Sequence, residues 1–176
     1  MPSMRPARLL TLAVLALAAA AAAADEAAEV RALLSRGELG AALLRAERAA
    51  AASPRDANLR FLHGVVLMDL QRDAAALEVF MTLSQEYPEL PDPLNNIALL
   101  HARAGDFEQA RQALESALRN DPGHRLARAN LGQVHLLLAV QAWERLGAQG
   151  PLDVALQRQL DGARALVAAG TRAAGR

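Results

Sequence analysis

The chain contains no cysteine and no lysine, although it is 176 residues long. The lack of cysteine excludes disulfides, thiolate metal sites, a cysteine nucleophile and a lipid-modified cysteine near the N-terminus. All 19 basic residues are arginine. We attribute this bias to a GC-rich genome rather than to a functional demand for guanidinium groups.

Aromatic residues are also scarce, at 3% of the chain, whereas 53% of the residues are hydrophobic and many of these are alanine. This composition favours helices that pack closely on small side chains over a sheet or a large aromatic core. The formal net charge is zero, so the chain lacks the excess positive charge that attracts nucleic acid or a membrane surface. We therefore expect neither kind of partner.

Sequence motifs of catalysis are absent as well. The chain has no G-x-S-x-G, no P-loop, no glycine-rich phosphate cradle and no H-E-x-x-H. We therefore expect no enzyme activity, no catalytic residue and no cofactor.

The four histidines do not form a metal-binding pattern. His101 and His135 lie 34 residues apart, in equivalent positions on helices whose axes should be about 8–10 Å apart. That separation is too large for the two side chains to share a metal ion without reaching inward. We expect these two and His63 to pack against neighbouring residues without metal, and His124 to be solvated.

Residues 1–24 have the features of a secretory signal peptide. Arg5 and Arg8 precede an apolar run of 16 residues, which ends in small residues before Asp25. A membrane span needs roughly 20 apolar residues, and this run is shorter and half alanine. Cleavage near Ala24 is therefore preferred over an uncleaved anchor, and we expect a periplasmic or secreted protein. The alternative is a membrane-anchored protein that retains residues 1–24.

The rest of the chain repeats itself at intervals of 34 residues. Three prolines and three alanines stand in register, namely Pro54, Pro88, Pro122, Ala42, Ala76 and Ala110. The clearest unit, residues 91–122, has two runs of apolar residues at a helical period. Gly105 can end the first helix of this unit, and Asp106 can cap the second with its side chain. A hairpin this small cannot bury its own apolar faces, so the units should stack on one another.

This pattern resembles the tetratricopeptide repeat family. The positions that match the family pattern are Gly64, Leu67, Ala76, Phe80, Leu83 and Pro88 in one unit, and Ile97, Ala98, His101, Ala110, Leu114, Ala117 and Pro122 in the next. The resemblance implies an all-α fold, a short right-handed α-solenoid of helical hairpins. The run YPELPDPLNN and the shortened unit after it also resemble small exported tetratricopeptide repeat proteins of proteobacteria.

The repeat divides the chain into seven segments. These are the signal peptide (1–24), a degenerate first repeat or N-terminal cap (25–56), two complete repeats (57–90 and 91–124), a fused and shortened fourth unit (125–150), a C-terminal capping helix (151–170) and a tail (171–176). The interval from Gly132 to Pro151 is 19 residues, against 24 for the equivalent interval in the third unit. Because the shortening removes the turn, we predict one long helix from Arg125 to Leu146.

Several helix ends follow from capping residues. We expect a short helix over residues 25–35, a helix capped by Asp56, and another capped by Asp92 with Pro93 as its first residue. Pro151 should open the last helix, and the tail after Ala169 should fray. We expect Asn96 and Asn130 to form structural hydrogen bonds. Trp143 can serve either as a core anchor or as an aromatic residue that faces a partner.

The resemblance implies a concave groove that is lined by the first helix of each unit. The residues it places there are Arg31, Asn58, Phe61, Val65, Met68, Asp69, Asp92, Asn95, Leu99, Arg103 and Gln133. This surface mixes apolar side chains with amides and single charges, which suits an extended peptide or a partner helix. We therefore expect an exported adaptor that binds a protein or peptide. The alternative is an anchored subunit of a membrane complex.

Overall fold

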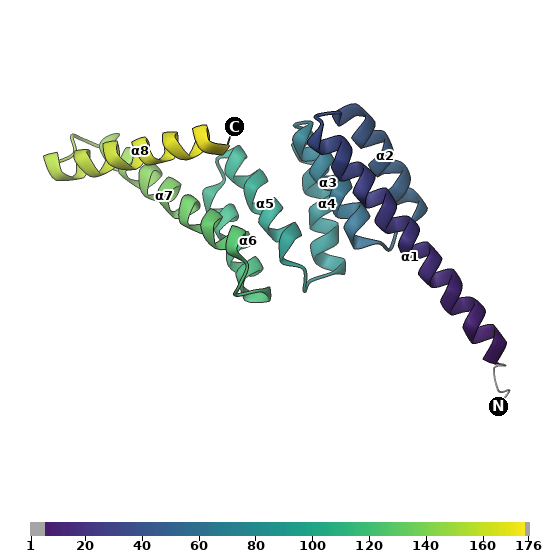
Figure 1. Ribbon diagram of the computed structural model, residues 1–176. Coiled ribbons are helices and arrows are strands. Elements are labelled where there is room, and N and C mark those ends of the chain that lie inside the picture. Colours follow the sequence, from purple (N-terminus) through teal and green to yellow (C-terminus); the bar gives the residue numbers. More distant parts are fainter. Residues whose placement is uncertain (1–5, 175–176) are drawn as a thin grey trace. The chain divides into compact units, whose positions relative to one another are not determined.

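The structure is a computed structural model that describes the backbone of residues 6–174 and the side chains of residues 21–170. The described residues form eight helices and no strand (Figure 1), which confirms the all-α fold class. By their internal contacts, residues 1–87 and 88–176 form two compact units. Among the residues that the structure describes, no helix has the length and apolar character needed to span a membrane.

The first unit contains two helical hairpins. They comprise α1 (Pro6–Ser35), α2 (Leu39–Ala52), α3 (Ala57–Asp69) and α4 (Asp73–Glu86). Helix α3 packs on both helices of the first hairpin, and small side chains on α2 allow this close approach. The core between these three helices contains Val30, Ala42, Ala46, Leu59, Leu62 and Val66.

The second unit begins with a hairpin of α5 (Pro91–Ala104) and α6 (Phe107–Asn120). Helix α7 (Arg125–Gly147) packs on both of these helices, and α8 (Val154–Ala174) packs on α7. The core of this unit is again rich in alanine, and it contains Ala98, Ala110, Leu114, Ala117, Ala127 and Val134.

The turns inside the three hairpins share one backbone conformation. Gly37, Gln71 and Gly105 follow one another at the 34-residue spacing, and their φ angles are 73°, 59° and 83°. This left-handed conformation costs glycine nothing, but it is unfavourable for a residue with a Cβ. Gln71 therefore adopts the conformation of a glycine turn without being glycine.

The fourth position in this series is Ala139, and it lies inside α7. An alanine favours the right-handed helix and disfavours the left-handed turn, so the helix continues where the earlier units reverse direction. The predicted single helix from Arg125 to Leu146 is confirmed, with one further residue at its end.

Four helix boundaries differ from the prediction. Helix α1 begins at Pro6 rather than Asp25, because the alanine-rich segment before Asp25 has a high helix propensity. Helix α5 begins at Pro91 and not at Pro93; proline is tolerated throughout the first turn, where the N–H groups have no partner within the helix. Helix α8 begins at Val154, because Asp153 and not Pro151 caps it, its Oδ1 accepting a hydrogen bond from the Leu156 N–H at 2.8 Å. Its backbone stays helical to Ala174, through most of the tail that was expected to fray.

The capping residues were predicted with mixed success. Asp56 accepts a hydrogen bond from the backbone N–H of Leu59 at 3.0 Å, as expected of an N-cap. Asp106 is the residue before α6, but its side chain forms no capping hydrogen bond. Asp92 lies within the first turn of α5 rather than before it. Asp106 and Asp92 were therefore wrongly predicted to cap through their side chains.

Candidate partner-binding surfaces

In the first unit, five of the residues predicted to line the groove lie along α3. Asn58, Phe61, Val65 and Met68 recur at intervals of three and four residues, and Asp69 follows Val65 by four, so they share one face of the helix. The three middle residues are apolar and half-buried, while Asn58 and Asp69 at the two ends are exposed. The face therefore has an apolar centre with a polar residue at each end.

Two contacts hold this face in place. The Nη2 of Arg31 on α1 donates to Oδ1 of Asn58 at 2.8 Å, which joins the first helices of two neighbouring hairpins. The ring of Phe61 lies 5.5 Å from the ring of Phe80 at an interplanar angle of 52°, a tilted arrangement that aromatic pairs favour. Because Phe80 is completely buried, Phe61 is anchored at its base and not free to swing.

In the second unit, Asn95, one of the polar residues predicted for the groove, is engaged within the fold. Asn95 is only 7% exposed, and its Oδ1 accepts a hydrogen bond from Nδ2 of Asn130 at 2.8 Å. This bond links α5 to α7, as expected for Asn130. Asn96, at 8% exposure, is likewise buried, and no buried side-chain N or O atom among the described residues lacks a hydrogen-bond partner.

His124 and Asp92 form a second link between α5 and α7. Nδ1 of His124 accepts the backbone N–H of Ala127 at 3.0 Å, and Nε2 lies 3.0 Å from Oδ1 of Asp92. Because Nδ1 accepts a hydrogen bond, the ring proton is on Nε2, from which it is donated to the carboxylate. His124 is thus the N-cap of α7 and not a solvated residue, which corrects the sequence prediction.

The remaining predicted groove residues of this unit differ in exposure. Leu99 is half-buried and Arg103 is exposed. Gln133 on α7 is in contact with α8, because a Cβ added to Gly170 would lie 2.5 Å from its Nε2. The neighbouring Gly132 has nothing within 4 Å of its Cβ position. Helix α8 therefore lies on the side of α7 that carries Gln133 and leaves the Gly132 side open.

Three further contacts fix α8 on α7. Arg164 donates to Oε1 of Glu144 through Nε at 3.1 Å and through Nη2 at 2.8 Å, and Leu160 and Ala163 are buried. Trp143 is half-buried and borders a small crevice with Leu152 and Leu160 at the junction of the two helices.

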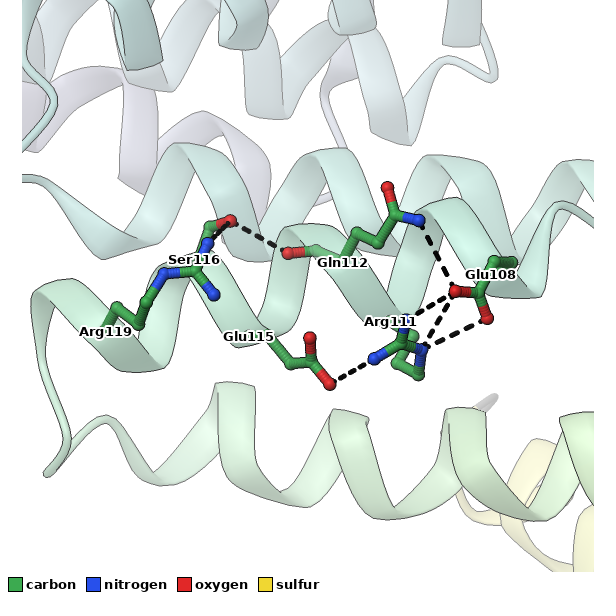
Figure 2. Close-up of polar contacts among 6 residues, drawn as sticks. All are labelled: Glu108, Arg111, Gln112, Glu115, Ser116 and Arg119. Atoms are coloured by element: carbon green, nitrogen blue, oxygen red, sulfur yellow. Dashed lines mark hydrogen bonds and ion pairs between the residues drawn. The ribbon is translucent and has the colours of Figure 1, made fainter.

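Helix α6 carries a ladder of polar contacts (Figure 2). Arg111 lies between Glu108 and Glu115 and pairs with both, and Gln112 donates to Glu108 at 3.4 Å. These hydrogen bonds raise the pKa of Arg111 above its ordinary value and lower the pKa of Glu108. The equivalent positions of the first two units are Leu43 and Leu77. The last complete hairpin therefore has a polar surface where the earlier hairpins have an apolar residue.

The described side chains offer no cluster suited to a metal ion, since no three His, Asp or Glu residues among them come together. Nδ1 of His101 is 3.9 Å from Oδ2 of Asp106, and His135 lies exposed on α7. Burial lowers the pKa of His63, and the charge of Glu47 opposes this shift only in part. His63 and His101 are half-buried, as expected of packing residues, whereas His135 is exposed and was wrongly predicted to pack.

Sequence reasoning missed a cavity of about 830 Å³ between α1 and α2. The signal for it was present, because Glu26 and Glu29 occupy positions that hold Leu94 and Ile97 in the third unit. By sequence alone, residues 25–56 are only a degenerate first repeat or N-terminal cap. The crevice that they border becomes apparent only once the two helices are placed side by side.

Comparison with known proteins identifies the repeat. The sequence profile described as tetratricopeptide repeat matches residues 27–91 and 95–151. No curated protein matches the sequence.

Similar solved structures include the first tetratricopeptide repeat domain of human RPAP3, with a TM-score of 0.62, 15% identity and coverage of 66% of this chain and 92% of that one. The first such domain of Spaghetti, solved with the HSP90 peptide SRMEEVD, has a TM-score of 0.61, 15% identity and coverage of 66% and 93%. YrrB, a repeat protein described as having an unusual peptide-binding site, has a TM-score of 0.55, 25% identity and coverage of 57% and 52%. The profile match spans more than half of the chain, which therefore belongs to the tetratricopeptide repeat family.

Proposed function

We propose that this protein is an exported adaptor that binds a segment of another protein and catalyses no reaction. The observation that carries the proposal is the face of α3, where Phe61, Val65 and Met68 form an apolar strip between Asn58 and Asp69. Such a strip can receive the apolar side chains of a bound segment, and the polar ends can bond its backbone or its charges.

The preformed geometry of this face favours binding. The contact with the buried Phe80 restrains Phe61, and the hydrogen bond from Arg31 restrains Asn58. Side chains that are already ordered lose little entropy when a partner docks. Two structurally similar proteins are described with a bound peptide or a peptide-binding site, and this supports a peptide as the ligand class here.

Photo-crosslinking tests the proposed surface. Phe61 is replaced by benzoylphenylalanine in cells of the source organism, and the control places the same residue at Gln112, on the outer face of α6. We expect a discrete crosslinked protein from position 61 and none from position 112. Crosslinks from position 112 alone would refute binding at α3.

Export rests on residues 1–24, with their two arginines, apolar run and small residues before Asp25. We propose cleavage near Ala24 and release into the cell envelope. N-terminal sequencing of the protein from fractionated cells tests this, and the expected first residue is Asp25 or a close neighbour.

A membrane-anchored subunit is the second candidate. The observation that favours it is the continuity of α1, which extends as one helix from Pro6 into the first repeat at Ser35. An intact Met1 on membrane-bound material would establish this alternative and exclude the exported adaptor.

A further inference from the structure

The face of the first unit formed by α1 and α2 contains an open, mostly apolar crevice. Its volume is about 830 Å³. Small residues such as Ala41 and Ala52 line it together with Leu33, Leu44 and Leu59. Leu44 is 50% exposed, which is high for a leucine beside a crevice. This surface is distinct from the face of α3 that carries the proposed groove.

The repeat register explains why the crevice is open. In the third unit the positions of Glu26 and Glu29 are occupied by Leu94 and Ile97, both of which pack into the core. In α1 these two positions carry acids that line the α1 side of the crevice, and Oε1 and Oε2 of Glu26 accept hydrogen bonds from Arg45 at 3.1 and 2.8 Å. The crevice therefore has acids on its α1 side, at positions where the third unit has apolar side chains.

The two sides of the crevice carry opposite charges. Glu26 and Glu29 belong to α1, and Arg45 and Arg48 belong to α2. No ion pair within the described part of the chain involves Glu29 or Arg48. Glu26 and Arg45 pair with each other within one chain. A partner that presents positive charge over α1, negative charge over α2 and an apolar group between them adds opposite charges beside that pair.

We propose that the partner for this face is a second copy of the same chain, docked face to face in a two-fold dimer. A two-fold axis that lies in the plane of the interface, parallel to α1 and α2 and midway between them, places α1 of each copy over α2 of the other. Glu26 of one copy then meets Arg45 of its partner, and the reverse contact follows from the symmetry. Leu44 of each copy is directed toward the apolar lining of the other.

The opposite charges also select the orientation of the dimer. A two-fold axis across the helices would place α1 over α1 and the acids over one another, and such like-charge contacts oppose association. The axis along the helices brings only opposite charges together. The same face thus carries the acids on α1 and the arginines on α2 that complement each other. An isologous dimer requires such a self-complementary face.

Charge-reversal variants, tested alone and as a mixture, test the proposal. The protein is used as purified, and mass spectrometry of the intact chain determines its N-terminus. Glu26→Arg and Arg45→Glu each give a face whose two sides carry the same charge. We expect the wild type to dimerise and each variant to dimerise at least about a hundredfold more weakly. Mixed in equal amounts, the two variants should form a heterodimer, because the arginines of one then meet the glutamates of the other. The measurement is sedimentation velocity over a concentration series.

A second pair of variants tests the apolar contact. Leu44→Glu should abolish the dimer, whereas Leu126→Glu changes an exposed leucine of the second unit and should leave it intact. Far-ultraviolet circular dichroism checks that every variant is folded, and an exposed ion pair contributes little to stability. A monomeric wild type, a mixture that fails to associate, or equal effects of the two leucine variants would overturn the proposal.

Discussion

Gly64 lies directly against the ring of Phe80. A Cβ at this position would be 2.6 Å from Cε1 and 2.8 Å from Cζ of the ring, although real Cβ atoms stay more than 3 Å from such neighbours. The ring cannot move aside, because Phe80 is completely buried between α3 and α4. The absence of a side chain at Gly64 is therefore what sets the spacing of this hairpin.

Gly64→Ala should destabilise the protein by ~1–3 kcal/mol, because the added methyl group overpacks a closed core. The matched control is Gly132→Ala, in the same repeat position but with no atom within 4 Å of the new Cβ. In a helix this control should be neutral or stabilising by ~0.5–1 kcal/mol. Urea denaturation followed by circular dichroism measures both, and equal effects would contradict the packing argument.

Gln71→Gly should stabilise the protein by about 1 kcal/mol. Gln71 holds a φ of 59°, a conformation that costs a residue with a Cβ about 1–2 kcal/mol and costs glycine almost nothing. Part of this gain is offset because glycine is more flexible in the unfolded chain. The reverse change, Gly105→Gln, should lower the free energy of unfolding in the equivalent turn. A loss of stability in Gln71→Gly would show that the glutamine side chain has a stabilising role of its own.

Asp56→Ala should lower the free energy of unfolding by about 1 kcal/mol, because the carboxylate accepts a hydrogen bond from the Leu59 N–H at the start of α3. Asp106→Ala removes an aspartate from the corresponding position before α6, where no side-chain capping bond exists. We therefore expect Asp106→Ala to lower the free energy of unfolding by less than Asp56→Ala does. Thermal unfolding of the two variants in parallel gives the comparison, and a larger loss at Asp106 would refute it.

His63 should make stability dependent on pH. Burial lowers its pKa in the folded protein below the ordinary value of 6.5. Below that value the unfolded chain binds a proton that the folded chain resists, so the free energy of unfolding falls as the pH drops. His63→Gln removes this group, and its stability should fall less than that of the wild type between about pH 7.5 and about pH 5.5. Parallel curves for the two proteins would contradict this assignment.

Local features of the sequence predicted most of the helical architecture. The register of prolines and alanines indicated the hairpins, and Asp56 and Gly105 marked helix ends because capping depends only on residues nearby in the chain. The long α7 followed from a missing turn. Ala139 is helical and stands where the earlier units have Gly37, Gln71 and Gly105 in a left-handed turn.

The surfaces were predicted less well, because they depend on which helices come together. The sequence placed Asn95 in a groove, yet Asn95 is buried and bonded to Asn130. Gln133 is exposed, as a groove residue should be, but its side chain lies near Gly170 of α8. His124 was expected in solvent and instead links α5 to α7. The position of a residue in the repeat predicts the face of the helix on which it lies. It does not predict which residues of other helices will contact it.

The sequence by itself determined that this chain is a series of short helical hairpins, because period, capping and turn conformation are set by neighbouring residues. Only the tertiary structure decided that α8 covers the Gln133 side of α7, that Phe80 fills the space left by Gly64, and that a crevice lies between α1 and α2. These features arise from packing between residues distant in the chain, where the outcome depends on the shapes of both partners.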